Sequence, residues 1–304
     1  MKLGLQSAIL AKKNFREVVD ICGQIGYEAL EVMCWPKGKA LRRYGGVTHL
    51  DIVGQTWQEL CNELAYAKEK GVEVSALGYY PNPLSGDQNE AAAAIELLNI
   101  LIQVAKDTGV GMVTTFIGRD KEKTVEENLL AFKEVWSPLI DLAEKNQVKV
   151  AIENCPMFFT QAEWPGGNNL ACTPAIWKEM FSLIDSDQLG LNYDPSHCVI
   201  LDIDHLRPLY DFSKKIFHIH FKDTKLYRDK LDQHGRLAYP LAYMAPKLPG
   251  LGDIDWAAFC SALYDIGFTG YACVEAEDRA FEEDEEAVLR GLRLAYDHIR
   301  PYIG

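Results

Sequence analysis

The sequence lacks the marks of several protein classes. None of its eight cysteines forms a CxxC pair, and its first residues, MKLGLQSAIL, contain no apolar core of a signal peptide. No apolar run approaches the length of a membrane-spanning helix, about 18 residues or more. We therefore expect a cytoplasmic chain with reduced thiols, without disulfide staples and without a membrane as partner.

Positive charge is scarce as well. Lysine and arginine together number 31 against 44 aspartates and glutamates, which gives a formal net charge of −13. An acidic surface repels the phosphate backbone of nucleic acids, so nucleic acid is not an expected partner. The hydrophobic fraction of 48% is that of an ordinary globular protein with a sizeable core.

Eight short apolar runs alternate with longer helical patterns along the chain. Two of the helical patterns begin at Asn14 and Thr124, each a capping residue followed three positions later by glutamate. This alternation predicts an α/β fold with a parallel sheet. The first turn, residues 6–13, contains no glycine, which favours a (β/α)₈ TIM barrel over a dinucleotide-binding fold. The predicted strands are 2–6, 29–33, 73–77, 112–116, 148–153, 189–193, 216–221 and 271–275.

Three long loops follow predicted strands, at residues 34–55, 156–172 and 224–254. Barrel enzymes build their sites from the loops at the carboxyl ends of the strands. We therefore expect a single barrel domain over residues 1–304, with these three loops at the catalytic face.

Four acid or imidazole side chains stand at the ends of consecutive predicted strands: Glu153, Asp194, His220 and Glu275. A charged residue at the end of an apolar strand is costly unless it is paired or bound to a metal. Three carboxylates side by side at one barrel mouth repel one another unless a cation lies between them. The set therefore predicts one divalent metal ion. Its oxygen-rich donors favour Mn²⁺, with Mg²⁺, Co²⁺ or Zn²⁺ as alternatives.

The segments around these residues resemble the xylose isomerase-like barrel superfamily, which includes sugar phosphate isomerases and epimerases, ketose 3-epimerases, inosose dehydratases and endonuclease IV. The resemblance covers essentially the whole chain. It implies that Glu153, Asp194, His220 and Glu275 hold the metal, that the two glutamates act as acid and base, and that His197 contacts substrate. The segments are Ile152-Glu153-Asn154, Asp194-Pro-Ser-His197, His218-Ile-His220-Phe-Lys-Asp223, Pro249-Gly-Leu-Gly-Asp-Ile-Asp-Trp256 and Val274-Glu275.

The chain departs from the ketose 3-epimerases at one position. Those enzymes carry an arginine six residues after the metal-binding histidine, where this chain has Leu226. Arg228 is the candidate to replace that arginine in binding substrate. Lys222 is a second candidate, which either orients the substrate or pairs with a neighbouring acid. The run Lys222-Asp223-Thr-Lys225 instead resembles inosose dehydratase-like members.

The expected function is that of a metal-dependent sugar isomerase or epimerase. One glutamate would remove a proton alpha to a carbonyl, the metal would stabilise the enediolate, and the other glutamate would return a proton. The same half-reaction serves a keto-sugar or keto-glycoside lyase or dehydratase, which is the alternative. An endonuclease IV-like phosphodiesterase is a remote alternative, because its zinc cluster needs more histidines than the seven present here. The expected ligand is a small sugar or keto-sugar, and a homo-oligomer stays open.

Three further polar residues have a structural interpretation beside a functional one. Glu31, ending the second predicted strand, either lies in the pocket or, as favoured here, forms a plain salt bridge. His218 points the same way as His220 but lies deeper, which favours a core histidine or a partner of a metal ligand. Asn154 is equally compatible with a hydrogen bond to a neighbouring residue and with a substrate contact.

Overall fold

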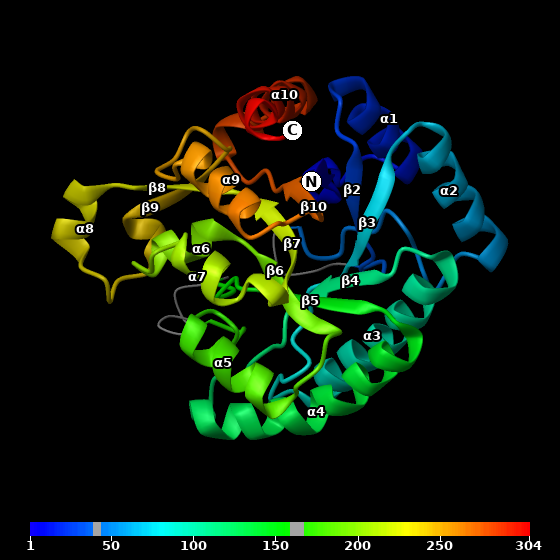
Figure 1. Ribbon diagram of the computed structural model, residues 1–304, viewed down its shortest axis with the longest axis horizontal. Helices are drawn as coiled ribbons and strands as arrows, with labels where there is room; N and C mark the ends of the chain where they lie inside the picture. Colours follow the sequence, from blue (N-terminus) through cyan, green and yellow to red (C-terminus); the bar gives the residue numbers. More distant parts are fainter. Residues whose placement is uncertain (39–43, 159–166) are drawn as a thin grey trace.

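Eight parallel strands close into a barrel, as the computed structural model of residues 1–38, 44–158 and 167–304 shows (Figure 1). Each strand pairs with its neighbours in sequence, and the last barrel strand pairs with the first. The (β/α)₈ barrel predicted from the sequence is thereby confirmed. The barrel strands are β1 (Lys2–Gln6), β2 (Ala29–Met33), β3 (Glu73–Gly78), β4 (Met112–Thr115), β5 (Lys149–Glu153), β6 (Leu189–Tyr193), β7 (Ile216–Phe221) and β10 (Tyr271–Val274).

Helices cover the outside of the barrel, with α1 and α2 beside β2 and β3, and α10 beside the C-terminus (Figure 1). This cover explains why β2 and β6 are buried at every residue. The helices are α1 (Phe15–Ile25), α2 (Trp57–Glu69), α3 (Gln88–Thr108), α4 (Val125–Asn146), α5 (Pro174–Leu183), α6 (Pro195–Ile200), α7 (Arg207–Asp211), α8 (Arg228–His234), α9 (Trp256–Asp265) and α10 (Glu285–Ile299). None of the helices described is both long and apolar enough to cross a membrane.

The helix starts predicted at Asn14 and Thr124 are confirmed, and α2 begins in the same way at Thr56. Each of these residues accepts a hydrogen bond from the glutamate amide three residues later, while the side chain of that glutamate bonds back to the cap. Such reciprocal capping satisfies two backbone donors that would otherwise lack a partner at the helix start. It fixes where each helix begins and therefore how long each preceding loop is.

Glycine is required where β6 passes β7. A Cβ atom on Gly190 would lie 2.5 Å from the backbone oxygen of Lys215 and 2.4 Å from the ring of Phe217. Contacts that short do not occur for real side chains, so only glycine fits. The close approach keeps β6 and β7 paired, and these two strands lead into Asp194 and His220.

The third predicted loop contains more structure than expected. Within residues 224–254, β8 (Asp223–Leu226) and β9 (Met244–Lys247) form an antiparallel ribbon, with α8 and the 3-10 helix η4 (Pro240–Ala242) between them. The ribbon extends away from the barrel, and α8 lies at its far end (Figure 1). The other two loops include residues 39–43 and 159–166, which lie outside the described residues.

Candidate active site

The four predicted metal ligands meet at the carboxyl ends of neighbouring strands. Glu153 ends β5, Asp194 follows β6 as the N-cap of α6, His220 lies in β7, and Glu275 follows β10. One ligand atom from each lies within 4.8 Å of the others. All four side chains are buried, and even Glu275 is only 7% exposed. The structure therefore brings the predicted set together in a single buried cluster.

Three atoms of this cluster that could bind a metal have no hydrogen-bond partner among the residues that the structure describes. They are Oδ2 of Asp194, Nδ1 of His220 and Oε2 of Glu275. Nδ1 of His220 lies 3.0 Å from Oε2 of Glu275 and 3.7 Å from Oε1 of Glu153. A buried polar atom without a partner is costly, and a bound cation would satisfy all three at once. The residues therefore fit a divalent metal ion, and the oxygen-rich donor set is the kind that Mg²⁺ and Mn²⁺ accept.

The two glutamates are held in their charged form. Burial opposes the charge of Glu275, but Lys222 and His220 outweigh it and lower the pKa of this carboxyl to about 2. Burial of Glu153 is likewise outweighed by His197 and His220, which lower the pKa of Glu153 below its usual range. Both carboxylates are therefore ionised at neutral pH and able to accept a proton.

His197 lies at the edge of the cluster and lines a pocket beside it. Its Nε2 atom lies 3.2 Å from Oε1 of Glu153 and 3.1 Å from Oδ2 of Asp194. Asn154 is fully buried and is not part of the pocket lining. Its side chain accepts from the backbone N–H of Asp194 at 2.8 Å and donates to the backbone oxygen of Asp194 at 2.9 Å. Of its two interpretations, the structure thus shows the hydrogen bond to a neighbour, which fixes Asp194.

The two predicted substrate-binding cations lie in different places. Lys222 lines the pocket, and its Nζ atom lies 3.2 Å from Glu275 and 2.6 Å from Glu277. Burial works against its charge, yet these two glutamates hold the pKa of Lys222 well above the usual value. Arg228 is exposed at the start of α8 and does not line the pocket. The structure therefore brings Lys222 to the site and leaves Arg228 outside it.

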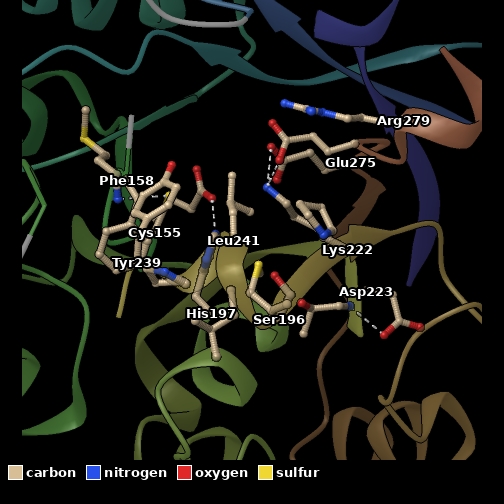
Figure 2. Close-up of a pocket in the computed structure, with 18 residues that line it drawn as sticks. Cys155, Phe158, Ser196, His197, Lys222, Asp223, Tyr239, Leu241, Glu275 and Arg279 are labelled. Atoms are coloured by element: carbon tan, nitrogen blue, oxygen red, sulfur yellow. Dashed lines mark hydrogen bonds and ion pairs between the residues drawn. The ribbon is translucent and has the colours of Figure 1, made fainter. Parts of the chain in front are cut away.

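The pocket has a volume of about 240 Å³ and two unlike sides. Figure 2 shows Lys222 and Glu275 together on one side, with Arg279 beyond them, and Phe158 and Tyr239 on the other. The sequence placed the loops after β5 and β7 at the catalytic face but singled out none of the apolar residues of the pocket, which come from the loop after β5, from α6 and from the β8–β9 segment. The apolar residues that line the pocket include Phe158, Ile200, Leu241, Met244 and Pro246.

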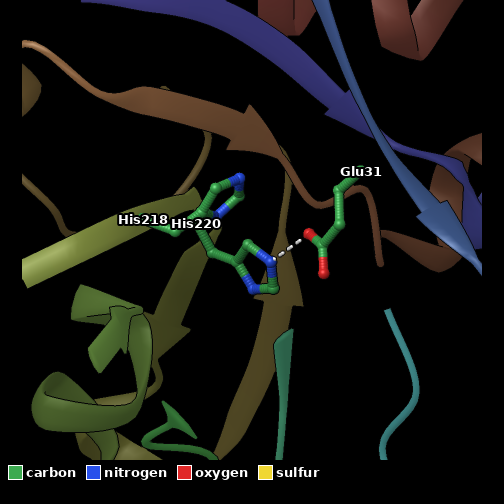
Figure 3. Close-up of side chains that lie close together, drawn as sticks. All are labelled: Glu31, His218 and His220. Carbon is green, nitrogen blue, oxygen red and sulfur yellow. Dashed lines mark hydrogen bonds and ion pairs between the residues drawn. The ribbon is translucent and has the colours of Figure 1, made fainter. Parts of the chain in front are cut away.

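Glu31 is the other residue whose position sequence reasoning missed. Glu31 does form an ion pair, as expected, but inside the barrel: it is fully buried, and its Oε2 atom is 2.6 Å from Nε2 of His220 (Figure 3). His218 is fully buried and bonds to Asn192 at 2.9 Å, as expected of a core histidine near a ligand. The only sequence signal for Glu31 is an acidic residue inside an apolar strand.

Proteins of similar sequence include inosose isomerases and inosose dehydratases. The inosose isomerase of Bacillus velezensis is 23% identical over 285 residues, which cover 90% of this chain and 88% of that protein. The inosose dehydratase of Clostridium tetani is 24% identical over 254 residues, which cover 73% and 82%. The solved structure of the IolI protein with a bound zinc atom aligns over the full length of both chains, with a TM-score of 0.73 and 22% identity.

The family comparison agrees with the geometry. The model of the xylose isomerase-like TIM barrel family matches residues 19–298. This range includes every barrel strand after β1, and it includes all four clustered residues. The chain belongs to the xylose isomerase-like TIM barrel family.

Proposed function

We propose that this protein is a sugar isomerase or epimerase that uses one divalent metal ion, with Mn²⁺ as the preferred ion. The observation that carries the proposal is the buried cluster of Glu153, Asp194, His220 and Glu275, whose potential ligand atoms lie within 4.8 Å of one another. Three of the cluster's atoms have no hydrogen-bond partner in the part of the chain that the structure describes. Such a bound ion would supply Lewis-acid chemistry that polarises a substrate carbonyl. The inosose isomerase relative supports a reaction on a polyhydroxylated ring.

The two glutamates are placed to move a proton. Glu153 comes from β5 and Glu275 from the end of β10, with β6 and β7 between them in the barrel. A substrate held between these positions would meet one carboxylate on each side. One glutamate takes the proton from the carbon alpha to the carbonyl, and the other returns a proton. Return to the opposite face of the same carbon gives the epimer, and return to the former carbonyl carbon gives the isomer. Lys222 keeps Glu275 ionised, and His197, next to Glu153, would hydrogen-bond a substrate hydroxyl.

A lyase or dehydratase that acts on a keto-sugar or keto-glycoside is the second candidate, and the apolar side of the pocket favours it. Leu241 projects beside the pocket with 46% of its surface exposed. An apolar wall next to a polar cluster suits a substrate that carries an apolar substituent. In this reaction a glutamate removes the alpha proton, the bond to the substituent oxygen on the next carbon breaks, and Lys222 protonates the departing oxygen.

Deuterium exchange tests the proposal and separates its two versions. The purified protein, loaded with Mn²⁺, would be incubated in D₂O with free ketoses, ketose phosphates, inososes and 3-keto-glycosides, and the products read by NMR and mass spectrometry. We expect deuterium at the carbon alpha to the carbonyl, lost when a chelator is added. Unchanged substrate mass apart from deuterium indicates an isomerase or epimerase, and loss of water or an aglycone indicates a lyase.

A pair of variants completes the experiment. Glu153→Gln and Glu275→Gln each keep the shape of the side chain but remove the base. Exchange that persists at the wild-type rate in both folded variants would overturn the proposal. Arg228→Ala serves as the matched control, because Arg228 is exposed and lies outside the pocket.

A further inference from the structure

A layer of buried polar side chains lies directly beneath the four clustered residues. Six barrel strands or the turns after them contribute to it, and its members are hydrogen-bonded to one another. In a barrel interior this layer is usually filled by branched apolar side chains. Polar side chains there are costly unless every one has a partner, so the layer requires an explanation. Its members are Glu31, Ser75, Tyr80, Thr114, Asn192, His218 and Cys273.

Glu31 is the member of this layer that contacts the cluster. It lies in β2, where the pairing with β3 shifts register between Leu30 and Glu31. One carboxylate oxygen, Oε1, accepts hydrogen bonds from Tyr80 Oη and from Thr114 Oγ1, the latter at 2.6 Å. The other oxygen, Oε2, is left for Nε2 of His220 at 2.6 Å. The carboxylate is therefore fixed by two hydroxyl groups and directed at one imidazole nitrogen.

This contact determines which nitrogen of His220 carries the proton. An ionised carboxylate only accepts hydrogen bonds, so Nε2 must be the donor. The amide nitrogen of Asn192 also lies 2.9 Å from Nε2, but an amide nitrogen offers no lone pair to that proton. The opposite nitrogen, Nδ1, faces Glu153 and Glu275 and has no hydrogen-bond partner within residues 1–38, 44–158 and 167–304. Figure 3 shows His220 turned toward Glu31, while the ring of His218 lies away from that carboxylate.

We infer that Glu31 is a positioning residue of the metal centre, which holds the ring of His220 so that the Nδ1 lone pair points at the ion. The inference rests on the proposed function, since it concerns the same site. A carboxylate behind a histidine ligand fixes the ring orientation and raises the basicity of the ligating nitrogen. The buried network of Tyr80, Thr114 and Asn192 then has a role in function, because it fixes the carboxylate that positions the ligand.

Metal affinity of the apo protein, measured by competition with a chelator, tests the inference independently of activity. Glu31→Gln keeps the shape but removes the charge, and we expect Mn²⁺ to bind about 10–100-fold more weakly. Ser75→Ala is the matched control. It removes a 3.2 Å contact to His218 in the same buried layer but leaves Glu31 and His220 in place, so we expect wild-type affinity. The visible spectrum of bound Co²⁺ should also change in Glu31→Gln and stay unchanged in Ser75→Ala.

The outcomes separate the inference from the proposed function. If folded Glu31→Gln binds Mn²⁺ as tightly as the wild type and leaves the Co²⁺ spectrum unchanged, Glu31 has no positioning role, although the metal centre stands. If the wild type binds no divalent ion, both the inference and the proposed function fail. Should Glu31→Gln fail to fold, Glu31→Asp replaces it. The shorter carboxylate cannot keep the 2.6 Å contact, so weaker binding is again expected, and wild-type affinity would overturn the inference.

Discussion

Asp223 anchors the segment that leads from the β8–β9 ribbon into α9, and its replacement by asparagine should destabilise the protein markedly. The carboxylate is fully buried, and five donors surround it. Its Oδ2 atom accepts hydrogen bonds from three groups and its Oδ1 atom from two. The three are Gly250 N at 3.0 Å, Gly252 N at 3.1 Å and Trp256 Nε1 at 2.9 Å, and the two are Thr224 N at 2.8 Å and Ile254 N at 3.3 Å.

The magnitude follows from what an asparagine can offer in the same place. Its single oxygen can face the three donors that bind Oδ2, but its NH₂ group then faces the two donors that bind Oδ1. Each of these two buried donors costs about 1–3 kcal/mol when left without an acceptor, so Asp223→Asn should lower the free energy of unfolding by about 2–6 kcal/mol. No rearrangement of the side chain avoids this loss, because an amide has only one acceptor oxygen.

Urea unfolding, followed by tryptophan fluorescence, measures this effect. The matched control is Asp255→Asn in the same segment. Asp255 is exposed and caps α9 by accepting from Ala258 N at 3.0 Å, a role that asparagine performs equally well. We expect the control to unfold like the wild type. If Asp223→Asn does so too, within about 0.5 kcal/mol, the hydrogen-bond reasoning is wrong.

Three further predictions concern activity, pH and the exposed arginine. Glu275→Gln should lower kcat by about 10²–10⁴-fold while leaving the circular dichroism spectrum unchanged, and wild-type turnover would exclude Glu275 as a proton-transfer group. Burial lowers the pKa of His49 from 6.5 to about 4, so the unfolded chain binds the proton more readily and stability falls as pH drops through that window. Between pH 7 and pH 4.5, the free energy of unfolding measured with urea should fall by about 2 kcal/mol less in His49→Asn than in the wild type. An equal fall in both proteins would show that His49 does not contribute to the pH dependence of stability. Arg228→Ala should leave KM unchanged in steady-state assays, and a large rise in KM would place Arg228 at the substrate.

The barrel and the cluster could be predicted because both depend on local signals. Apolar runs mark the buried parallel strands, and capping residues such as Asn14 mark the helix starts. Because parallel strands all end at one mouth, Glu153, Asp194 and Glu275 had to come close together once the strands were known. The fold follows from these local signals, and the four-residue cluster follows from the fold.

The parts that sequence reasoning missed depend on contacts across the closed barrel or on short irregular elements. Glu31 meets His220 only because β2 and β7 face each other across the interior, which no local pattern reveals. The strands β8 and β9 are each only four residues long, and Pro246 within β9 makes that segment unlike a strand in its sequence. Arg228 begins the short helix α8 at the end of that ribbon, so the place of this helix decides where Arg228 lies. The spacing between Arg228 and His220 in the sequence could not predict that Arg228 is exposed and outside the pocket lining.

Anomalous diffraction from crystals grown with Mn²⁺ tests the central claim most directly. We expect one strong peak within bonding distance of Glu153, Asp194, Glu275 and Nδ1 of His220, the atoms that this structure gathers within 4.8 Å. A map without a peak among these four side chains, or with its peak elsewhere in the protein, would contradict the account of the metal centre.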